Sequence, residues 1–392
     1  MTRESVIFIG GRFFDGNRLH DGKAASFRDG IFTGLVPETE TTRDCETVDL
    51  DGGILSPGYV DLQVNGGDGV MFNDDPSVAT LTRIASAHRS LGTTAILPTL
   101  ITDTPEKTKA AIDAARYAIN GKVPGIAGLH LEGPHLSVAR KGAHDADLIR
   151  PMEDTDLRLL LAAKADIPVL KVTVAPESTT PDQIATLAAA GILVSLGHTD
   201  AGFETCKSYA EAGARCVTHL FNAMSQLGNR EPGLVGATLA TGTLSAGLIA
   251  DGIHVHPAAM RTAWDSKAGP GQIFLVSDAM AVAGTALTEF FLEGRRISRN
   301  DGRLTLEDGT LAGADLDLTT AIRVLVNDVG VALEQALQAT TTTPGALIDQ
   351  PTTPRPGSTH LSDLIHISSC LRHLTPLDRF ASSVPSKSAR AE

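Results

Sequence analysis

The stretch that decides the fold runs from Gly128 to Asp145 and reads GLHLEGPHLSVARKGAHD. Its apolar beginning stops at Glu132, and Gly133-Pro134 breaks the run directly afterwards, which predicts a strand with a carboxylate at its carboxyl end. In α/β barrel enzymes the chemistry lies at that end of the strands. Because a Glu before Gly-Pro is more often a turn residue when taken alone, the rest of the chain has to decide between the two interpretations.

The composition favours a compact α/β protein. With 392 residues the chain can form one large barrel or two to three ordinary domains, and its 42% hydrophobic residues and 38 glycines suit a large core with many tight connections. The net charge of -13 argues against a general surface for nucleic acid or for an anionic membrane. An anionic substrate would therefore need a local basic site.

Cysteine usage and the first residues predict a reduced, cytoplasmic setting. The cysteines, at positions 45, 206, 216 and 370, have neither paired short spacing nor a zinc-knuckle pattern. The chain begins MTRES without a signal-like apolar segment, and no run approaches the roughly eighteen apolar residues of a membrane span. We expect neither a membrane nor a nucleic acid as a partner.

The pattern of apolar and turn residues divides the chain into a short β segment and a long α/β segment. Residues 1–55 hold short β-like runs at 6–9, 24–27 and 31–35, separated by Asp-Gly turns, and predict the first part of a small β domain. From Tyr59 onward apolar strands alternate with helical stretches. The strand candidates are 58–64, 94–98, 126–132, 169–175, 192–197, 215–219, 246–250 and 273–277. The helix candidates include 77–90, 105–119, 181–190 and 202–212, with Thr104-Pro105 and Pro181 suited to helix starts.

Eight strand–helix units predict a closed (β/α)8 TIM-type barrel over residues 56–350. An open doubly wound sheet is the alternative. That fold needs a glycine-rich phosphate turn after its first strand, and NGGDG at 65–69 matches the motif poorly.

Polar residues stand at the ends of most of the predicted strands. They are Gln63, Asn65, Glu132, His198, His219, Asp251 and Asp278. Because all strand carboxyl ends of a barrel face one pocket, we expect these side chains to converge. Glu132, His198 and His219 are ligands of the right type for a catalytic divalent metal, and Asp278 is then a candidate general base for the attacking water. The sequence therefore predicts a metal-dependent hydrolase.

Each of these residues also has a structural interpretation. His198 could begin a helix, His219 could be a satisfied core histidine, and Asp278 could cap the next turn. His130, inside the apolar run, is left as a structural residue and is not assigned to the metal. One shared site explains the four strand-end residues together.

Longer motifs occur in order between about residues 50 and 345. They are PGYVDLQVNG (57–66), HLEGP (130–134), KGAH (141–144), LGHT (196–199), HLFNAM (219–224), REPG (230–233), ADGIH (250–254), SDAM (277–280) and GTLAG (309–313). With these motifs the chain resembles the N-acetylglucosamine-6-phosphate deacetylases of the amidohydrolase superfamily.

The resemblance implies one divalent metal per subunit, bound by Glu132, His198 and His219, with Asp278 as the catalytic acid and base. It implies further that the amino sugar is contacted by Ala143, His144, Asn222, Ala223, His254, Leu311, Ala312 and Gly313. Arg230 is expected to hold the phosphate, and in such enzymes part of the phosphate site comes from the other subunit of a homodimer. The products would be acetate and D-glucosamine 6-phosphate, in amino-sugar catabolism or cell-wall recycling.

The first predicted strand ends in Gln63-Val64-Asn65, where many amidohydrolases have His-x-His and bind a second metal. Because neutral amides are weak ligands for transition metals, we expect a single metal, with Gln63 and Asn65 orienting a water or the substrate. Zinc is the first choice, and iron or manganese would bind similar ligands.

Other interpretations stay open at this stage. The chain could be a different amidohydrolase, such as a cyclic-amide hydrolase or another N-acyl sugar or amino-acid deacylase, or a non-enzymatic scaffold. Arg230 could be a surface residue paired with Glu231. His144, Asn222 and His254 could be ordinary loop residues.

Beyond the barrel, the pattern predicts short strands over 289–311, two helical stretches over 317–339, and a helix-cap role for Asp315. Residues 351–392 are expected to return to the small domain and complete a β-sandwich, through the run SDLIHI at 362–367. The polar end from Ser382 to Glu392 is expected to be disordered.

Overall fold

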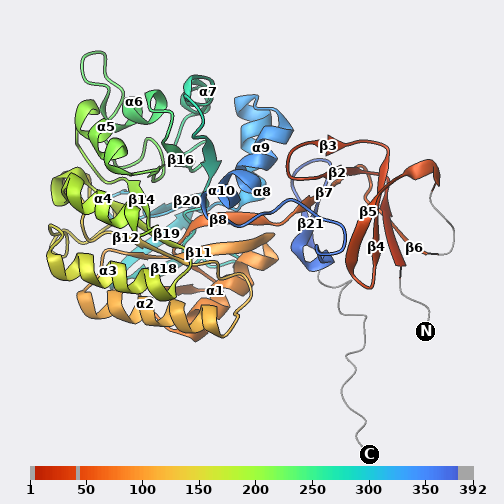
Figure 1. Ribbon diagram of the computed structural model, residues 1–392, viewed down its shortest axis with the longest axis horizontal. Helices are drawn as coiled ribbons and strands as arrows, with labels where there is room; N and C mark the ends of the chain where they lie inside the picture. Colours follow the sequence, from red (N-terminus) through yellow and green to blue (C-terminus); the bar gives the residue numbers. More distant parts are fainter. Residues whose placement is uncertain (1–4, 41–44, 378–392) are drawn as a thin grey trace, which may run out of the picture.

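The computed structural model describes residues 5–40 and 45–377. Figure 1 shows a large α/β lobe beside a smaller lobe built of strands. The terminal stretch from Ser382 to Glu392, for which disorder was predicted, lies outside the described residues. In the part of the chain that is described, no helix combines the length and the apolar character needed to cross a bilayer.

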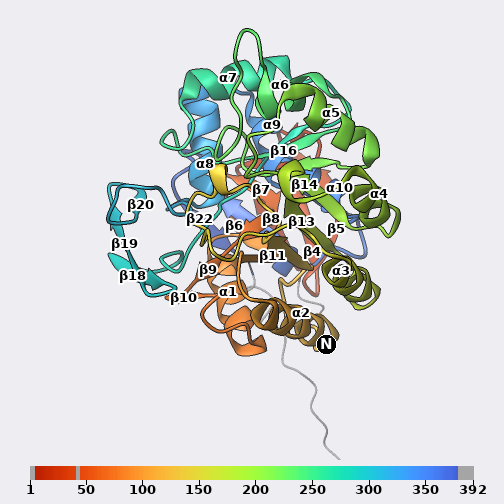
Figure 2. The same cartoon turned by 90° about the vertical axis from the view of Figure 1, so that its left-hand side faces the viewer.

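Parallel strands form the centre of the large lobe, and helices surround them (Figure 2). Within residues 45–377 the eight barrel strands are β8 (Tyr59–Val64), β11 (Thr93–Ile101), β12 (Leu129–Glu132), β13 (Leu170–Val174), β14 (Leu193–Leu196), β15 (Cys216–Val217), β16 (Ser245–Leu248) and β17 (Ile273–Leu275). Each pairs in parallel with the next along the chain. The predicted TIM-type barrel is confirmed.

The ring closes between its first and last strands, just beyond β17. The Asp278 N–H donates to the Gln63 carbonyl at 3.1 Å, and the Asn65 N–H donates to the Ala279 carbonyl at 2.9 Å. An open doubly wound sheet has no such closing contact, so that alternative is wrong.

Several of the helices begin at a residue whose side chain caps them. They are α1 (Val78–Ser90), α2 (Pro105–Asn120), α3 (Asp154–Asp166), α4 (Pro181–Ala189), α5 (Phe203–Ala212), α6 (Gly233–Ala240), α7 (Pro257–Ser266), α8 (Leu318–Val324), α9 (Leu333–Thr340) and α10 (Thr342–Leu347). Thr104 caps α2 ahead of Pro105, and Thr180 forms a capping box with Gln183 at the start of α4. Both predicted helix starts are therefore confirmed.

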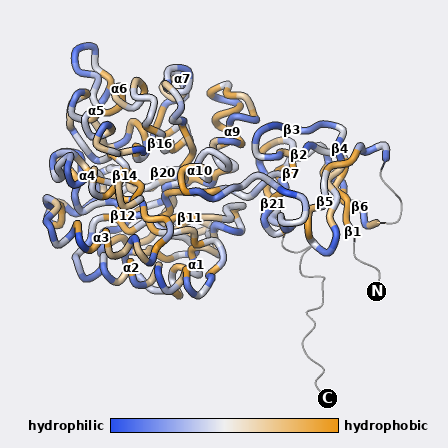
Figure 3. Tube along the Cα trace, in the orientation of Figure 1, coloured by the Kyte–Doolittle hydropathy of each residue, from blue (hydrophilic) through white to orange (hydrophobic). Residues whose placement is uncertain are grey.

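Alternation along β12 separates the core from the site. Leu129 and Leu131 pack into the main hydrophobic core, which Figure 3 shows as hydrophobic strands inside a more hydrophilic outer surface. His130 and Glu132, on the other face of the strand, point into the barrel interior, where their side chains bond residues of other strands. Truncating a fully buried leucine such as Leu129 would cost about 2–5 kcal/mol.

The small lobe contains two sheets, in the strand orders β5-β4-β1-β6 and β22-β21-β7-β2-β3. Its strands are β1 (Ser5–Ile9), β2 (Arg12–Phe14), β3 (Leu19–His20), β4 (Lys23–Arg28), β5 (Ile31–Pro37), β6 (Glu46–Asp49), β7 (Ile54–Pro57), β21 (Leu364–Ile367) and β22 (Leu374–Pro376). β21 pairs antiparallel with β7, which brings the run SDLIHI back to the first segment of the chain. The division at residues 55 and 350 stays a prediction.

A three-stranded antiparallel sheet lies beside the barrel mouth. It consists of β18 (Glu289–Leu292), β19 (Arg295–Asn300) and β20 (Arg303–Thr305) and shares a small core with Met280. A short hairpin, β9 (Gly66–Gly67) and β10 (Val70–Met71), contributes Met71 to the same core.

The predicted cap role of Asp315 is wrong. Asp317 caps α8, because its side chain accepts the N–H of Thr320 at 2.9 Å. Asp315 instead accepts a hydrogen bond from Arg299 Nε of β19 at 2.7 Å. That ion pair joins the three-stranded sheet to the loop that leads into α8.

Candidate active site

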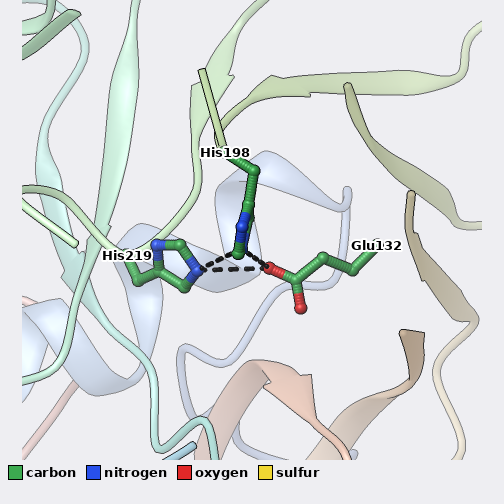
Figure 4. A group of neighbouring side chains, drawn as sticks. All are labelled: Glu132, His198 and His219. Carbon is green, nitrogen blue, oxygen red and sulfur yellow. Dashed lines mark hydrogen bonds and ion pairs between the residues drawn. The ribbon is translucent and has the colours of Figure 1, made fainter. Parts of the chain in front are cut away.

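Three buried side chains from different strands meet at the centre of the barrel mouth (Figure 4). Glu132 ends β12, while His198 and His219 follow β14 and β15. Glu132 Oε1 lies 3.2 Å from Nε2 of each histidine, and the two Nε2 atoms lie 3.0 Å apart. One ligand atom from each residue falls within 4.8 Å of the other two, so all three can bind one ion.

Backbone geometry turns the strand-end side chains inward. His198, His219 and Asp278 have φ values of 48°, 29° and 50°, in the left-handed region. This conformation costs about 1–2 kcal/mol for a residue with a Cβ atom. Such strain is characteristic of functional sites, where surrounding contacts hold it in place.

The donor set fits a divalent metal. His198 Nδ1 donates to the Arg140 carbonyl at 2.8 Å, so Nε2 is the atom that faces the centre. This Nε2 donates to Glu132 when it carries a proton and offers its lone pair to an ion when it does not. Burial alone would raise the pKa of Glu132, but its hydrogen bonds to His198 and His219 hold it well below the usual value. An ionised carboxylate and two imidazole nitrogens this close together are the ligand set of a catalytic zinc-type site.

Asp278 shares this centre with two amide side chains. Gln63 Nε2 donates to both carboxylate oxygens of Glu132 at 3.2 Å and to Asp278 Oδ1 at 3.1 Å, and Asn65 Nδ2 donates to Asp278 Oδ1 at 2.7 Å. Burial, and then the charge of Glu132, raises the pKa of Asp278. The amides thus separate two carboxylates that would otherwise repel each other.

A cavity of about 550 Å³ opens above these groups. Residues named from the sequence that line it are Asn65, Glu132, Ala143, His144, His198, His219, Asn222, Ala223, His254, Asp278, Leu311 and Gly313. Gln63 and Ala312 are fully buried and do not line it, and Arg230 is exposed and lies outside it. The structure therefore brings twelve of the fifteen named residues to one surface.

His144 faces the cavity as a neutral hydrogen-bond donor. Its Nδ1 accepts the Thr102 N–H at 3.3 Å and lies 2.8 Å from the Thr102 hydroxyl, so the ring proton sits on Nε2. Burial, and then the positive field of His198, lowers the pKa of His144 to about 3. Gly133 makes room for this contact, since a Cβ there would lie 2.1 Å from Thr102 Oγ1.

Sequence reasoning missed several residues that hold the named ones. Thr102 fixes His144, as described above. Asp251 bonds the ring of His254 at 2.6 Å, although it had been noted only as a strand-end residue. Arg295 of β19 donates to the Ala143 carbonyl at 2.8 Å. Only Asp251 gave a signal in the sequence, through its place in the ADGIH motif.

Arg230 lies in the exposed loop between β15 and α6. Among the described residues it forms no ion pair. The alternative pairing with Glu231 is absent there, because the Glu231 carboxylate accepts the backbone N–H groups of Phe203 and Gly233, at 2.7 and 2.9 Å. Within residues 5–40 and 45–377, no ion pair explains the position of this guanidinium.

Comparison with known proteins agrees with the site. The sequence profile of the amidohydrolase family matches residues 54–348. The chain belongs to the amidohydrolase family. It is a hydrolase, so the alternative interpretation of the chain as a non-enzymatic scaffold is wrong.

Relatives of this amidohydrolase act on phosphorylated amino sugars. It is 43% identical over 348 residues to the N-acetylgalactosamine-6-phosphate deacetylase of Shewanella sp. (strain ANA-3), with 88% of each chain covered. It is 35% identical to the N-acetylglucosamine-6-phosphate deacetylase of Haemophilus influenzae, over 81% of this chain and 83% of that protein. The crystal structure of N-acetylglucosamine-6-phosphate deacetylase from Pasteurella multocida has a TM-score of 0.86 and 31% identity, covering 94% of this chain and 96% of that one.

Proposed function

We propose that the enzyme hydrolyses the acetamide of an N-acetylhexosamine 6-phosphate, with N-acetyl-D-glucosamine 6-phosphate as the first candidate substrate. The convergence of Glu132, His198, His219 and Asp278 on one cavity carries the proposal. N-acetyl-D-galactosamine 6-phosphate is a second candidate, because a relative that is 43% identical is named for that activity. The two sugars differ only in the orientation of the 4-hydroxyl group.

The ligand set would hold one divalent metal per chain, and zinc is the ion we propose, with iron or manganese as alternatives. When bound, the metal would polarise the amide carbonyl and acidify the attacking water. Gln63 and Asn65 would be weak ligands for a second transition-metal ion, because their side chains are neutral amides whose NH₂ groups donate to Glu132 and Asp278.

Asp278 is placed to move the protons of the reaction. As a carboxylate it would remove a proton from the attacking water, whose oxygen forms a bond to the amide carbon. Neutral His144 would donate its Nε2 proton as a hydrogen bond to the oxygen that gains negative charge. Protonated Asp278 would then pass its proton to the nitrogen as the C–N bond breaks, which releases acetate and the free amine. Asn65 and Gln63 would keep the Asp278 carboxylate oriented throughout.

Phosphate recognition would require a second subunit. Arg230 is exposed on its own chain and outside the cavity, and a guanidinium suits a phosphate. We therefore propose a homodimer in which Arg230 of one chain reaches the cavity of the other. The buried thiols of Cys206 and Cys216 form no disulfide and suit the reducing cytoplasm.

The test is acetate release from both 6-phosphates and from their unphosphorylated sugars, with metal content measured on the same sample. Release that depends on the phosphate, with about one metal per chain, is expected. The ratio of kcat/KM for the two epimers identifies the substrate. Bound metal without release would refute the proposed substrate class, and a preference for a cyclic amide would favour the other amidohydrolase interpretation.

A further inference from the structure

A chain of buried polar side chains crosses the barrel beneath the metal-binding residues. Its members are Thr99 of β11, His130 of β12, Thr173 of β13, Ser195 of β14 and Thr218, which follows β15. None is more than 1% exposed. TIM-barrel interiors are normally filled by branched apolar side chains, so a polar layer here needs a reason.

The contacts form one continuous path. His130 Nδ1 lies 3.1 Å from Thr99 Oγ1, and His130 Nε2 lies 2.7 Å from Thr173 Oγ1. Thr173 Oγ1 lies 2.7 Å from Thr218 Oγ1, which lies 2.6 Å from Ser195 Oγ. We call this path the threonine–histidine chain.

One arrangement of protons satisfies every member of the threonine–histidine chain. The Thr99 hydroxyl donates to the Leu97 carbonyl at 3.1 Å, so its oxygen accepts from His130 Nδ1. His130 Nε2 then accepts from Thr173, and because a hydroxyl has one proton, Thr173 must accept from Thr218, which in turn accepts from Ser195. Every member is bonded in this arrangement, which makes the network rigid.

Each metal-binding side chain has a member of this chain close to it in sequence. His130 lies two residues before Glu132 on the same face of β12, and Thr173 is the neighbour of Glu132 in the β12–β13 register. Thr218 directly precedes His219. Ser195 lies on β14, whose end leads to His198.

Gly197, in the LGHT motif, is needed for the chain to close. A Cβ at this position would lie 2.9 Å from Thr173 Cγ2 and 3.0 Å from the Cβ of Thr218. Any side chain at position 197 would therefore push apart the two hydroxyl groups that link β13 to the residue before His219. Gly197 of the LGHT motif thus leaves room for the threonine–histidine chain, and the next residue, His198, is a proposed metal ligand.

We infer that the threonine–histidine chain positions Glu132, His198 and His219 for metal binding, with Thr173 as the central positioning residue. The inference rests on the proposed metal site. Groups that hydrogen-bond directly to metal ligands change metal affinity about 10- to 100-fold when removed. The hydroxyl groups of the threonine–histidine chain bond one another and act through the backbone that carries the ligands, so we expect the lower end of that range. A hydroxyl group that only stabilises the fold would change the unfolding temperature when it is removed and leave the metal affinity unchanged.

The deciding experiment compares Thr173→Val, which keeps the shape and removes the hydroxyl, with Thr173→Ser, which keeps the hydroxyl. Zn²⁺ dissociation constants are measured on the full chain by competition with a chromophoric chelator, together with thermal unfolding of the metal-free proteins. Thr173→Val should weaken binding about 10-fold. Thr173→Ser should stay within about threefold of the wild type, because the bond to His130 is kept.

Thr238→Val is the matched control, because Thr238 of α6 is equally buried and, among the described residues, its hydroxyl bonds only the Leu234 carbonyl. It should lower the unfolding temperature and leave Zn²⁺ affinity unchanged. If Thr173→Val does not fold, Ser195→Ala removes only the first donor of the chain and should weaken Zn²⁺ binding by a smaller factor.

An affinity in Thr173→Val, or in its replacement Ser195→Ala, equal to that of Thr238→Val would overturn the inference. A wild-type chain that binds no metal would overturn the metal site itself, and the inference with it.

Discussion

One chain builds the floor of the cavity, formed by Glu132, His198, His219 and Asp278, more completely than it builds the loop that carries Arg230. On the floor, all three proposed ligands are buried and bonded to their neighbours, and left-handed backbone geometry turns the two histidines inward. On the loop, Arg230 is exposed and forms no ion pair with the described residues. The comparison teaches that one chain alone organises the proposed bond-breaking residues, whereas the proposed phosphate contact of Arg230 needs another surface.

Removing the metal should have the largest effect and tests the floor as a whole. Dialysis against a strong chelator is expected to lower turnover more than about 10⁴-fold, because the metal supplies several kcal/mol of charge stabilisation. Turnover should return when Zn²⁺ is added. The melting temperature should fall in parallel, since a ligand that binds only the folded state stabilises it. Full turnover in metal-free protein would show that the floor of the cavity does not need a metal for the reaction.

Asp278→Asn should have the next largest effect. We expect kcat to fall about 10³- to 10⁴-fold, because the amide can neither accept nor deliver the proton. Metal content should stay near the wild-type value, since Asp278 is not one of the three ligands. Near-normal kcat in a metal-loaded Asp278→Asn protein would remove the residue from the mechanism.

His144→Ala should lower kcat about 10²- to 10³-fold, with a smaller effect on KM, because the lost hydrogen bond matters most as negative charge develops on oxygen. Because its pKa lies at about 3, His144 stays neutral from pH 5 to pH 9 and adds no step to the pH profile. The kcat–pH curves of wild type and His144→Gln should therefore bend at the same pH. A bend that disappears in His144→Gln would show that the ring titrates during catalysis.

Arg230→Ala should have the smallest effect and tests the loop. The loss of charged hydrogen bonds to a phosphate is expected to lower kcat/KM about 10- to 100-fold. The rate with the unphosphorylated sugar should be unchanged, which is the control within the same variant.

Mixed dimers sharpen this test. The experiment mixes Arg230→Ala chains with Asp278→Asn chains in equal amounts. About half of the randomly paired dimers then contain one chain of each kind. If Arg230 acts across the interface, one of the two sites in each such dimer has both native residues, so about a quarter of all sites should regain full activity. No recovery, in a mixture shown by mass spectrometry to exchange subunits, would place Arg230 in its own chain's site.

The barrel and the strand-end residues could be predicted because they follow from strong local patterns. Apolar runs that end in Glu132, His198, His219 or Asp278 need only the rule that parallel strands place their carboxyl ends together. The helix starts at Thr104 and Thr180 follow equally from capping chemistry.

The supporting residues could not be predicted, because their signal is lost in ordinary strand composition. Thr173 and Thr218 look like typical strand residues, since threonine is favoured in strands for its shape alone. Asp315 and Asp317 are equally good caps by type, and only the contact with Arg299 separates them. The exposure of Arg230 depends on tertiary structure that no local pattern encodes.

The closing contact of the barrel determines when the site becomes complete. Asp278 meets Asn65 and Gln63 across separations of 213 and 215 residues, and the same segment joins the last strand to the first. Glu132, His198 and His219 are all synthesised before Asp278. A nascent or truncated chain that ends before Asp278 would therefore contain all three proposed metal ligands and still lack the proposed proton-transfer group, so catalysis as proposed needs the segment that closes the barrel.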